Sequence, residues 1–186
     1  MSQGRIIIVS GPSGVGKGTI LRTVMQQHES LHYSVSATSR PMRPEDREGV
    51  SYYFVSRERF EALIADDALL EYAEYVGNYY GTPKAYVEEQ LARGKDVILE
   101  IEIQGALKVR RQFPDALLLF VTPPSAEVLK NRLIGRGTET MDVIEHRLAR
   151  ALEEAEGLEE YDYLVVNDVL EEAVREVHEI IQNEHY

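Results

Sequence analysis

An apolar segment that leads directly into a glycine-rich loop is the feature that most constrains the fold of this chain. Residues Arg5–Ser10 include the consecutive apolar side chains Ile6–Val9, and the loop Gly11-Pro-Ser-Gly-Val-Gly-Lys-Gly-Thr19 follows at once, running into a helical stretch at Gly16–Gln27. The loop matches the pattern G-x-x-x-x-G-K, which forms a phosphate-binding loop when it lies between a strand and a helix. We therefore predict a nucleotide-phosphate site at the end of this first strand.

The residue types in this loop suit a bound phosphate. The glycines let the backbone curl so that several N–H groups point at one phosphate, and the following helix adds the positive end of its dipole. Lys17 supplies a full positive charge to the β and γ oxygens of a nucleotide. The predicted phosphate-binding residues are Gly11, Pro12, Ser13, Gly14, Val15, Gly16, Lys17, Gly18 and Thr19.

The loop departs from the usual pattern at Gly18, where most such loops carry a serine or threonine that reaches magnesium. Thr19 has the nearest hydroxyl and is the candidate metal ligand of the loop. Direct ligation of the metal by this loop is left open.

Three further apolar runs predict a parallel sheet. They are Asp96–Glu102, Ala116–Thr122 and Tyr163–Asn167, and such near-continuous runs are typical of strands buried on both faces. Helical patterns follow these runs, so the predicted class is α/β. The predicted helices are Gln104–Phe113, Ser125–Gly135, Met141–Ala155 and Asp168–Gln182, the last with Asp168 as its N-cap.

The stretch from about Ser34 to Tyr80 has a different pattern. Short alternating segments at Val50–Val55 and Leu69–Tyr75 surround one helical stretch, Arg57–Ala65. We predict that this stretch is a mixed insertion on the α/β core. A helix should follow it, with Thr82–Pro83 as N-cap and first position and Gly94 as terminator.

Composition excludes several classes of protein. The longest apolar runs, such as Ala116–Val121, are far too short to span a bilayer, and the chain has no cysteine. No signal-peptide pattern opens the sequence, so we expect a soluble cytoplasmic protein. The net charge is −12 and is concentrated after Glu153, so we expect no nucleic-acid or membrane partner. The residues define no oligomeric state.

Six segments together resemble the guanylate kinases, from Arg5 to about Ile181. The segments are Gly11–Thr19, Ser36–Arg43, Gly77–Gly81, Ile98–Gly105, Gly135–Gly137 and Val166–Asn167. The resemblance implies a P-loop parallel sheet flanked by helices, with an inserted GMP-binding lobe and a mobile lid. It also implies transfer of the γ-phosphoryl group of ATP to GMP, giving ADP and GDP, with Mg²⁺ as cofactor.

The resemblance implies a guanine site, and the side chains assigned to it match the donors and acceptors of the base. Guanine has an O6 acceptor beside N1–H and N2–H₂ donors, so one carboxylate accepts from both donors while a hydroxyl donates to O6. Adenine has an acceptor at N1 and would oppose that carboxylate. By similarity, Glu71 is the carboxylate, Ser36 and Thr82 are the hydroxyls, and Glu102 is a further acceptor.

The phosphate of GMP requires cationic and neutral donors. By similarity these are Arg40 and Arg43, whose planar guanidinium groups match phosphate oxygens, together with Tyr52 and Tyr80.

The run Val97–Glu102 resembles the strand that carries an acid toward the metal in phosphate-loop enzymes, and this resemblance implies metal and base contacts for its two acids. Glu100 and Glu102 alternate with isoleucines, so both should point to the same side of the strand. We place Glu100 near magnesium, through water, because Mg²⁺ retains several waters in such sites.

A lid with arginines completes the predicted machinery. The glycine pair Gly135 and Gly137 suits a mobile segment whose closure excludes water. By similarity Arg132, Arg136 and Arg147 act with Lys17 in catalysis, and Asn167 approaches the adenine of ATP. The acceptor oxygen of GMP is already anionic, so no general base is needed. The five histidines match no site motif: His28, His32, His146, His178 and His185.

Two other functions stay open at this point. One is a kinase for another nucleoside monophosphate, and the other is a non-catalytic guanylate-kinase-like binding module. We predict a single domain over residues 1–186, with the core at 1–33, 83–124 and 151–186, the GMP-binding insertion at about 34–82 and the lid at about 125–150.

Overall fold

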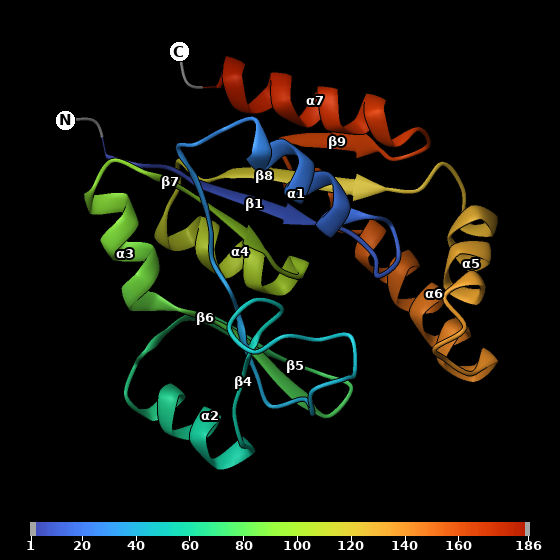
Figure 1. The fold of residues 1–186 in the computed structure, drawn as a ribbon, viewed down its shortest axis with the longest axis horizontal. Helices are drawn as coiled ribbons and strands as arrows, with labels where there is room; N and C mark the ends of the chain where they lie inside the picture. Colours follow the sequence, from blue (N-terminus) through green and yellow to red (C-terminus); the bar gives the residue numbers. More distant parts are fainter. Residues whose placement is uncertain (1–2, 185–186) are drawn as a thin grey trace. The chain divides into compact units, whose positions relative to one another are not determined.

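The computed structural model describes residues 3–184, and Figure 1 shows the arrangement of the elements. The described chain divides into two compact units. The first comprises residues 3–7, 30–99 and 104–116, and the second comprises 8–29, 100–103 and 117–184. His185 lies outside the described residues.

A five-stranded sheet confirms the predicted α/β class. Its strand order is β2 (Leu31–Tyr33), β7 (Asp96–Glu100), β1 (Ile6–Ser10), β8 (Leu117–Thr122) and β9 (Tyr163–Val166). Every residue of β1 is buried, as expected for a strand covered on both faces. β2 was not predicted because its three residues form no apolar run; its parallel pairing with β7, with Leu31 opposite Asp96, defines it instead.

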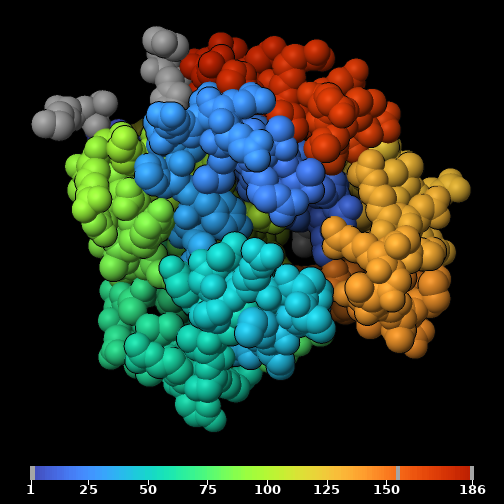
Figure 2. Space-filling view, viewed as in Figure 1, coloured from blue at the N-terminus to red at the C-terminus, as the bar shows by residue number. Residues whose placement is uncertain are grey.

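The helices of the second unit have nearly the predicted bounds. They are α1 (Lys17–Gln26), α5 (Ala126–Gly135), α6 (Met141–Ala155) and α7 (Leu170–Asn183), with a short 3-10 helix at Leu158–Glu160. α1 packs against α7, and α5 packs against α6. The acidic side chains of α7 lie on its exposed face, and this helix is red in Figure 2.

The predicted cap of α7 is wrong. Val169, not Asp168, precedes the helix, and no side chain caps it. Val169 is extended and its carbonyl accepts from the N–H of Ala173, so the helix begins one residue later than the sequence pattern indicates.

A second, four-stranded sheet in the first unit confirms the mixed character of the insertion. Its order is β4 (Tyr53–Phe54), β3 (Ala37–Thr38), β6 (Asn78–Pro83) and β5 (Leu69–Tyr75). β3 pairs parallel with β4, whereas β6 pairs antiparallel with both β3 and β5. α2 (Arg57–Ala65) begins after Ser56, whose hydroxyl accepts from the N–H of Arg59, and its Phe60 packs on this sheet. The predicted strand at Val50–Val55 shortens to the two residues of β4.

Two helices of the first unit complete the described fold, α3 (Lys84–Ala92) and α4 (Ile103–Gln112). The prediction that Thr82 caps α3 is wrong, because β6 continues to Pro83 and Pro83 is the N-cap. The Thr82 hydroxyl instead donates to Glu71. Within residues 3–184, no helix combines the length and apolar character needed to cross a membrane.

Candidate active site

The glycine-rich loop lies where β1 ends, and two of its glycines are required by close contacts. A Cβ on Gly11 would lie 2.2 Å from the carbonyl oxygen of Val121, and Gly11 has a φ of +149°. A Cβ on Gly16 would lie 2.6 Å from Nδ2 of Asn167, and Gly16 has a φ of +99°. Larger residues at these positions would be strained and would displace the loop.

Lys17 lies within the Gly11–Thr19 motif and is the first residue of α1, directly after Gly16. Its Nζ donates to the carbonyl oxygens of Gly11 at 2.5 Å and Pro12 at 3.1 Å. The ammonium group therefore lies against the loop, at the positive end of a ten-residue helix. A loop followed by a helix N-terminus with a lysine is an arrangement that binds phosphate.

Asn167 links the end of β9 to the loop. Its side chain is buried, and Nδ2 donates to the carbonyl oxygen of Val15 at 2.8 Å. Its backbone N–H donates to Thr122 at the end of β8. The predicted contact with adenine stays a prediction, and the structure gives Asn167 this contact with the loop.

Two of the three predicted lid arginines contact the residues around the loop. The Arg147 guanidinium donates to the hydroxyl of Ser13 and pairs with Glu139. Arg132 donates to the carbonyl oxygen of Asn167 at 2.9 Å. Arg136 follows α5 as its C-cap and is exposed.

The predicted strand carrying the two acids ends early. β7 ends at Glu100, and α4 begins at Ile103, so strand alternation does not extend to Glu102. The Ser10 hydroxyl donates to the carbonyl oxygen of Ile101 at 2.7 Å, just beyond the strand. Glu102 lies 3.6 Å from the Arg150 guanidinium of α6.

The donor set around the loop offers few protein ligands for a metal. A side chain at Gly18 would meet nothing within 4 Å, so a hydroxyl would fit there but is absent. Thr19 is exposed, and its hydroxyl accepts from Arg22 at 3.2 Å. No group of three or more potential ligand side chains (histidine, cysteine, aspartate or glutamate) is found in the described part of the chain. The two oxygen donors that the sequence analysis assigns to magnesium, Thr19 and Glu100, are of the type that Mg²⁺ prefers.

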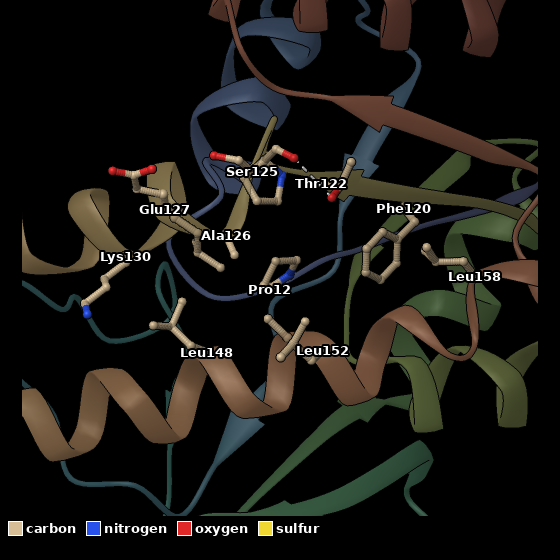
Figure 3. A pocket seen from close by; sticks show the side chains of 13 residues that line it. Pro12, Phe120, Thr122, Ser125, Ala126, Glu127, Lys130, Leu148, Leu152 and Leu158 are labelled. Carbon is tan, nitrogen blue, oxygen red and sulfur yellow. Dashed lines mark hydrogen bonds between the residues drawn. The ribbon is translucent and has the colours of Figure 1, made fainter.

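An apolar pocket of about 440 Å³ lies beside the loop in the second unit (Figure 3). Pro12 of the loop, Phe120 of β8 and the apolar side chains of α6 point into it. Leu152 of α6 lines the pocket and is 68% exposed, so α6 is incompletely packed on this side. The pocket is thus lined both by Pro12 of the loop and by α6, which carries Arg147.

The first unit contains a second polar site, built on β5 and β6. Glu71 is buried at the third position of β5, opposite Thr82 of β6. The Thr82 hydroxyl donates to Oε1 of Glu71 at 2.8 Å, and Thr82 is fully buried. A carboxylate accepts hydrogen bonds at both of its oxygens, so it can pair with two adjacent N–H donors.

Arg40 is positioned by an acidic side chain that the sequence analysis missed. Its guanidinium donates to Oδ2 of Asp46 at 2.9 Å, and the Arg43 N–H donates to the same oxygen at 2.8 Å. Burial opposes ionisation of Asp46, but these hydrogen bonds and the charges of the arginines hold the pKa of Asp46 below its ordinary value. The signal in the sequence is an acid three residues after Arg43, within one turn.

Aromatic rings surround Arg40. Its guanidinium lies 5.4 Å from the ring centre of Tyr52, and the rings of Tyr52 and Tyr80 are 5.8 Å apart, edge to face. The neighbouring Tyr79 stacks instead on Phe60 in the core of this unit. This alternation along β6 brings Tyr80, not Tyr79, to the arginine. Ser36 is half-buried, with its carbonyl accepting from the N–H of Tyr53.

The fold and these two sites define a class, the P-loop nucleotide-binding α/β proteins. The family model for guanylate kinase matches residues 3–184. A guanylate kinase of Listeria innocua serovar 6a is 54% identical over 184 residues, which cover 98% of this chain and 90% of that relative. The chain belongs to the guanylate kinase family.

Two further comparisons agree. A guanylate kinase of Lactococcus lactis subsp. lactis is 52% identical over 184 residues, covering 99% of this chain and 90% of the relative. The crystal structure of guanylate kinase from Anaplasma phagocytophilum is similar with a TM-score of 0.83 at 34% identity, covering 98% of this chain and 87% of that chain.

Proposed function

We propose that this chain transfers the γ-phosphoryl group of ATP to GMP, giving ADP and GDP. The observation that carries the proposal is the buried Glu71 carboxylate beside the Thr82 hydroxyl, in a chain of the guanylate kinase family. A carboxylate suits the N1–H and N2–H₂ donors of guanine and opposes the N1 acceptor of adenine. This favours GMP over other nucleoside monophosphates, while the intact phosphate loop with Lys17 favours an enzyme over a binding module.

The phosphates of ATP would lie in the loop Gly11–Thr19, where backbone N–H groups and the N-terminus of α1 supply positive potential. Lys17 would transfer its hydrogen bonds from the carbonyls of Gly11 and Pro12 to the β and γ oxygens. Bound Mg²⁺ would neutralise charge on those oxygens. Glu100 is the carboxylate that fits an outer contact with its waters, and Thr19 is the nearest hydroxyl.

GMP would bind through its base and its phosphate. Glu71 accepts from guanine, with Ser36, Thr82 and Glu102 as the further base contacts. Arg40, Arg43, Tyr52 and Tyr80 bind the phosphate, and Asp46 positions the two arginines for it.

Transfer requires alignment and positive charge rather than a base. The attacking oxygen of GMP is anionic at neutral pH, so this chain needs only to position it in line with the γ-phosphate. Lys17, Arg132, Arg136 and Arg147 would neutralise the charge that develops on the transferred group. Lid closure over the site would exclude water as a competing acceptor.

The proposed partners are therefore ATP and GMP. The net charge of −12 disfavours nucleic acid and anionic membranes as partners. A cytoplasmic location, where both nucleotides are available, fits this function.

The substitution Glu71→Gln tests the proposal. The amide presents one donor and one acceptor where the carboxylate presents two acceptors, so one guanine N–H would lose its partner and meet another donor. We expect KM for GMP to rise by about tenfold or more while KM for ATP changes less than twofold. Equal loss of both nucleotides would contradict the assignment of Glu71 to guanine.

A further inference from the structure

Gly105 lies where any side chain would collide with the carboxylate of Glu71. It is buried, at the third position of α4. A Cβ on Gly105 would lie 2.4 Å from Oε2 and 2.9 Å from Cδ of Glu71. Non-bonded carbon and oxygen atoms do not approach so closely, so the observed position of the carboxylate requires a glycine here.

The backbone gives no other reason for this glycine. Gly105 lies within a regular helix, and its φ is outside the left-handed region that favours glycine. Glycine within a helix is less favourable than alanine, so helix propensity does not explain glycine here either. The contact with Glu71 is therefore the feature that explains glycine at this position.

The two oxygens of the Glu71 carboxylate have different neighbours. Its Oε1 accepts from the buried Thr82 hydroxyl at 2.8 Å, while Oε2 faces the first turn of α4. The N-terminal turn of a helix is positive and favours an ionised carboxylate. Two elements, β6 and α4, thus determine where the acceptor oxygens of Glu71 lie.

We propose that Gly105 is a positioning residue for guanine recognition, acting through Glu71. The inference rests on the proposed function, because it assumes that Glu71 accepts from the base. A methyl group at position 105 would move the carboxylate by about 0.6 Å or more to reach the 3.0 Å contact limit. Hydrogen bonds weaken steeply with such misalignment, so GMP binding would suffer while ATP binding would not.

The variant Gly105→Ala tests this directly. We expect KM for GMP to rise about tenfold or more and KM for ATP to stay within twofold. The melting temperature should fall, because the methyl group overlaps a buried carboxylate, and the loss should be smaller in the Glu71→Asp background. Arg111→Ala on the exposed surface of the same helix is the matched control and should change neither KM.

A double-mutant cycle with Glu71→Asp separates positioning from general damage. Aspartate is one methylene shorter, so its carboxylate lies farther from α4 and leaves room for the methyl group. In the Glu71→Asp background, Gly105→Ala should therefore change KM for GMP by less than twofold. If Gly105→Ala alone failed to fold while the double variant folded, this rescue by the shorter side chain would itself support the steric conflict between position 105 and Glu71.

Three results would overturn the inference: wild-type KM for GMP in Gly105→Ala, an unchanged penalty in the Glu71→Asp background, or failure of both variants to fold. A failure of the proposed function would differ, because Glu71→Gln itself would then leave GMP use unchanged or the wild-type protein would not use GMP.

Discussion

At the scale of single residues, the position of the proposed guanine-binding carboxylate depends on residues that are distant in the sequence. Glu71, Thr82 and Gly105 come from β5, β6 and α4, and only the fold brings them together. The residue types of the two sites were predictable, because a phosphate or a guanine edge restricts which side chains can bind it. Gly105 was not predictable, because only the fold brings it against Glu71. Asp46 was missed although it lies three residues after Arg43, which is a local signal.

The pair of Arg40 and Asp46 gives a prediction with a defined pH dependence. Because the pKa of Asp46 is lowered in the folded protein, its stabilising effect is present above its ordinary pKa, near 4, and disappears as the pH falls through the lowered value. Asp46→Asn should cost about 1 kcal/mol or less at pH 7, and this difference should shrink toward pH 3.

Urea unfolding of wild type and Asp46→Asn at several pH values between 3 and 7 measures this difference. The variant should also raise KM for GMP several-fold, because Arg40 loses the group that positions it. The exposed neighbour Glu45 offers the control Glu45→Gln. A stability difference that grew toward acid pH would contradict the account.

At the scale of elements, the hydrophobic periodicity predicted which helices and strands exist better than it predicted where each one begins and ends. α2, α6 and β5 have the predicted bounds because each has a clear period and a clear end. β2 was missed because its pairing, not its composition, makes it a strand. The cap at Thr82 was wrong because a tertiary contact, the hydrogen bond from Thr82 to Glu71, determines that residue. The cap at Asp168 was wrong because α7 begins one residue later, after Val169.

The incomplete packing of α6 yields an element-scale prediction. Ala151 lines the apolar pocket beside Pro12, so Ala151→Leu would bury added apolar surface without disturbing the helix. We expect a gain of about 1 kcal/mol, or ~2–4 °C in melting temperature. If α6 moves during lid closure, the filled pocket would also lower kcat.

Calorimetry and steady-state kinetics on the same preparation test both effects. Ala149→Leu, at an exposed position of the same helix, controls for the larger side chain. A lower melting temperature for Ala151→Leu would mean that the space beside α6 does not accept an added side chain.

At the scale of the whole molecule, two compact units divide the proposed work. The second unit contains the phosphate loop, Lys17 and the lid arginines, and the first contains Glu71 and the cluster around Arg40. The residues proposed for the phosphoryl donor, ATP, thus lie mainly in the second unit, and those proposed for the acceptor, GMP, lie mainly in the first. The sequence analysis predicts a single domain with a GMP-binding insertion at about 34–82, whereas the first unit also contains residues 30–33, 83–99 and 104–116.

The most direct test of this account measures ADP formation from Mg-ATP with GMP, AMP, dTMP, CMP and UMP supplied separately at equal concentration. The account predicts strong turnover with GMP and at least a hundredfold lower kcat/KM with AMP, since a site that hydrogen-bonds one base edge rejects the other. Equal or faster turnover with another nucleotide would contradict the guanine assignment of Glu71. No turnover with any acceptor, from folded protein that binds ATP, would contradict the enzymatic function itself.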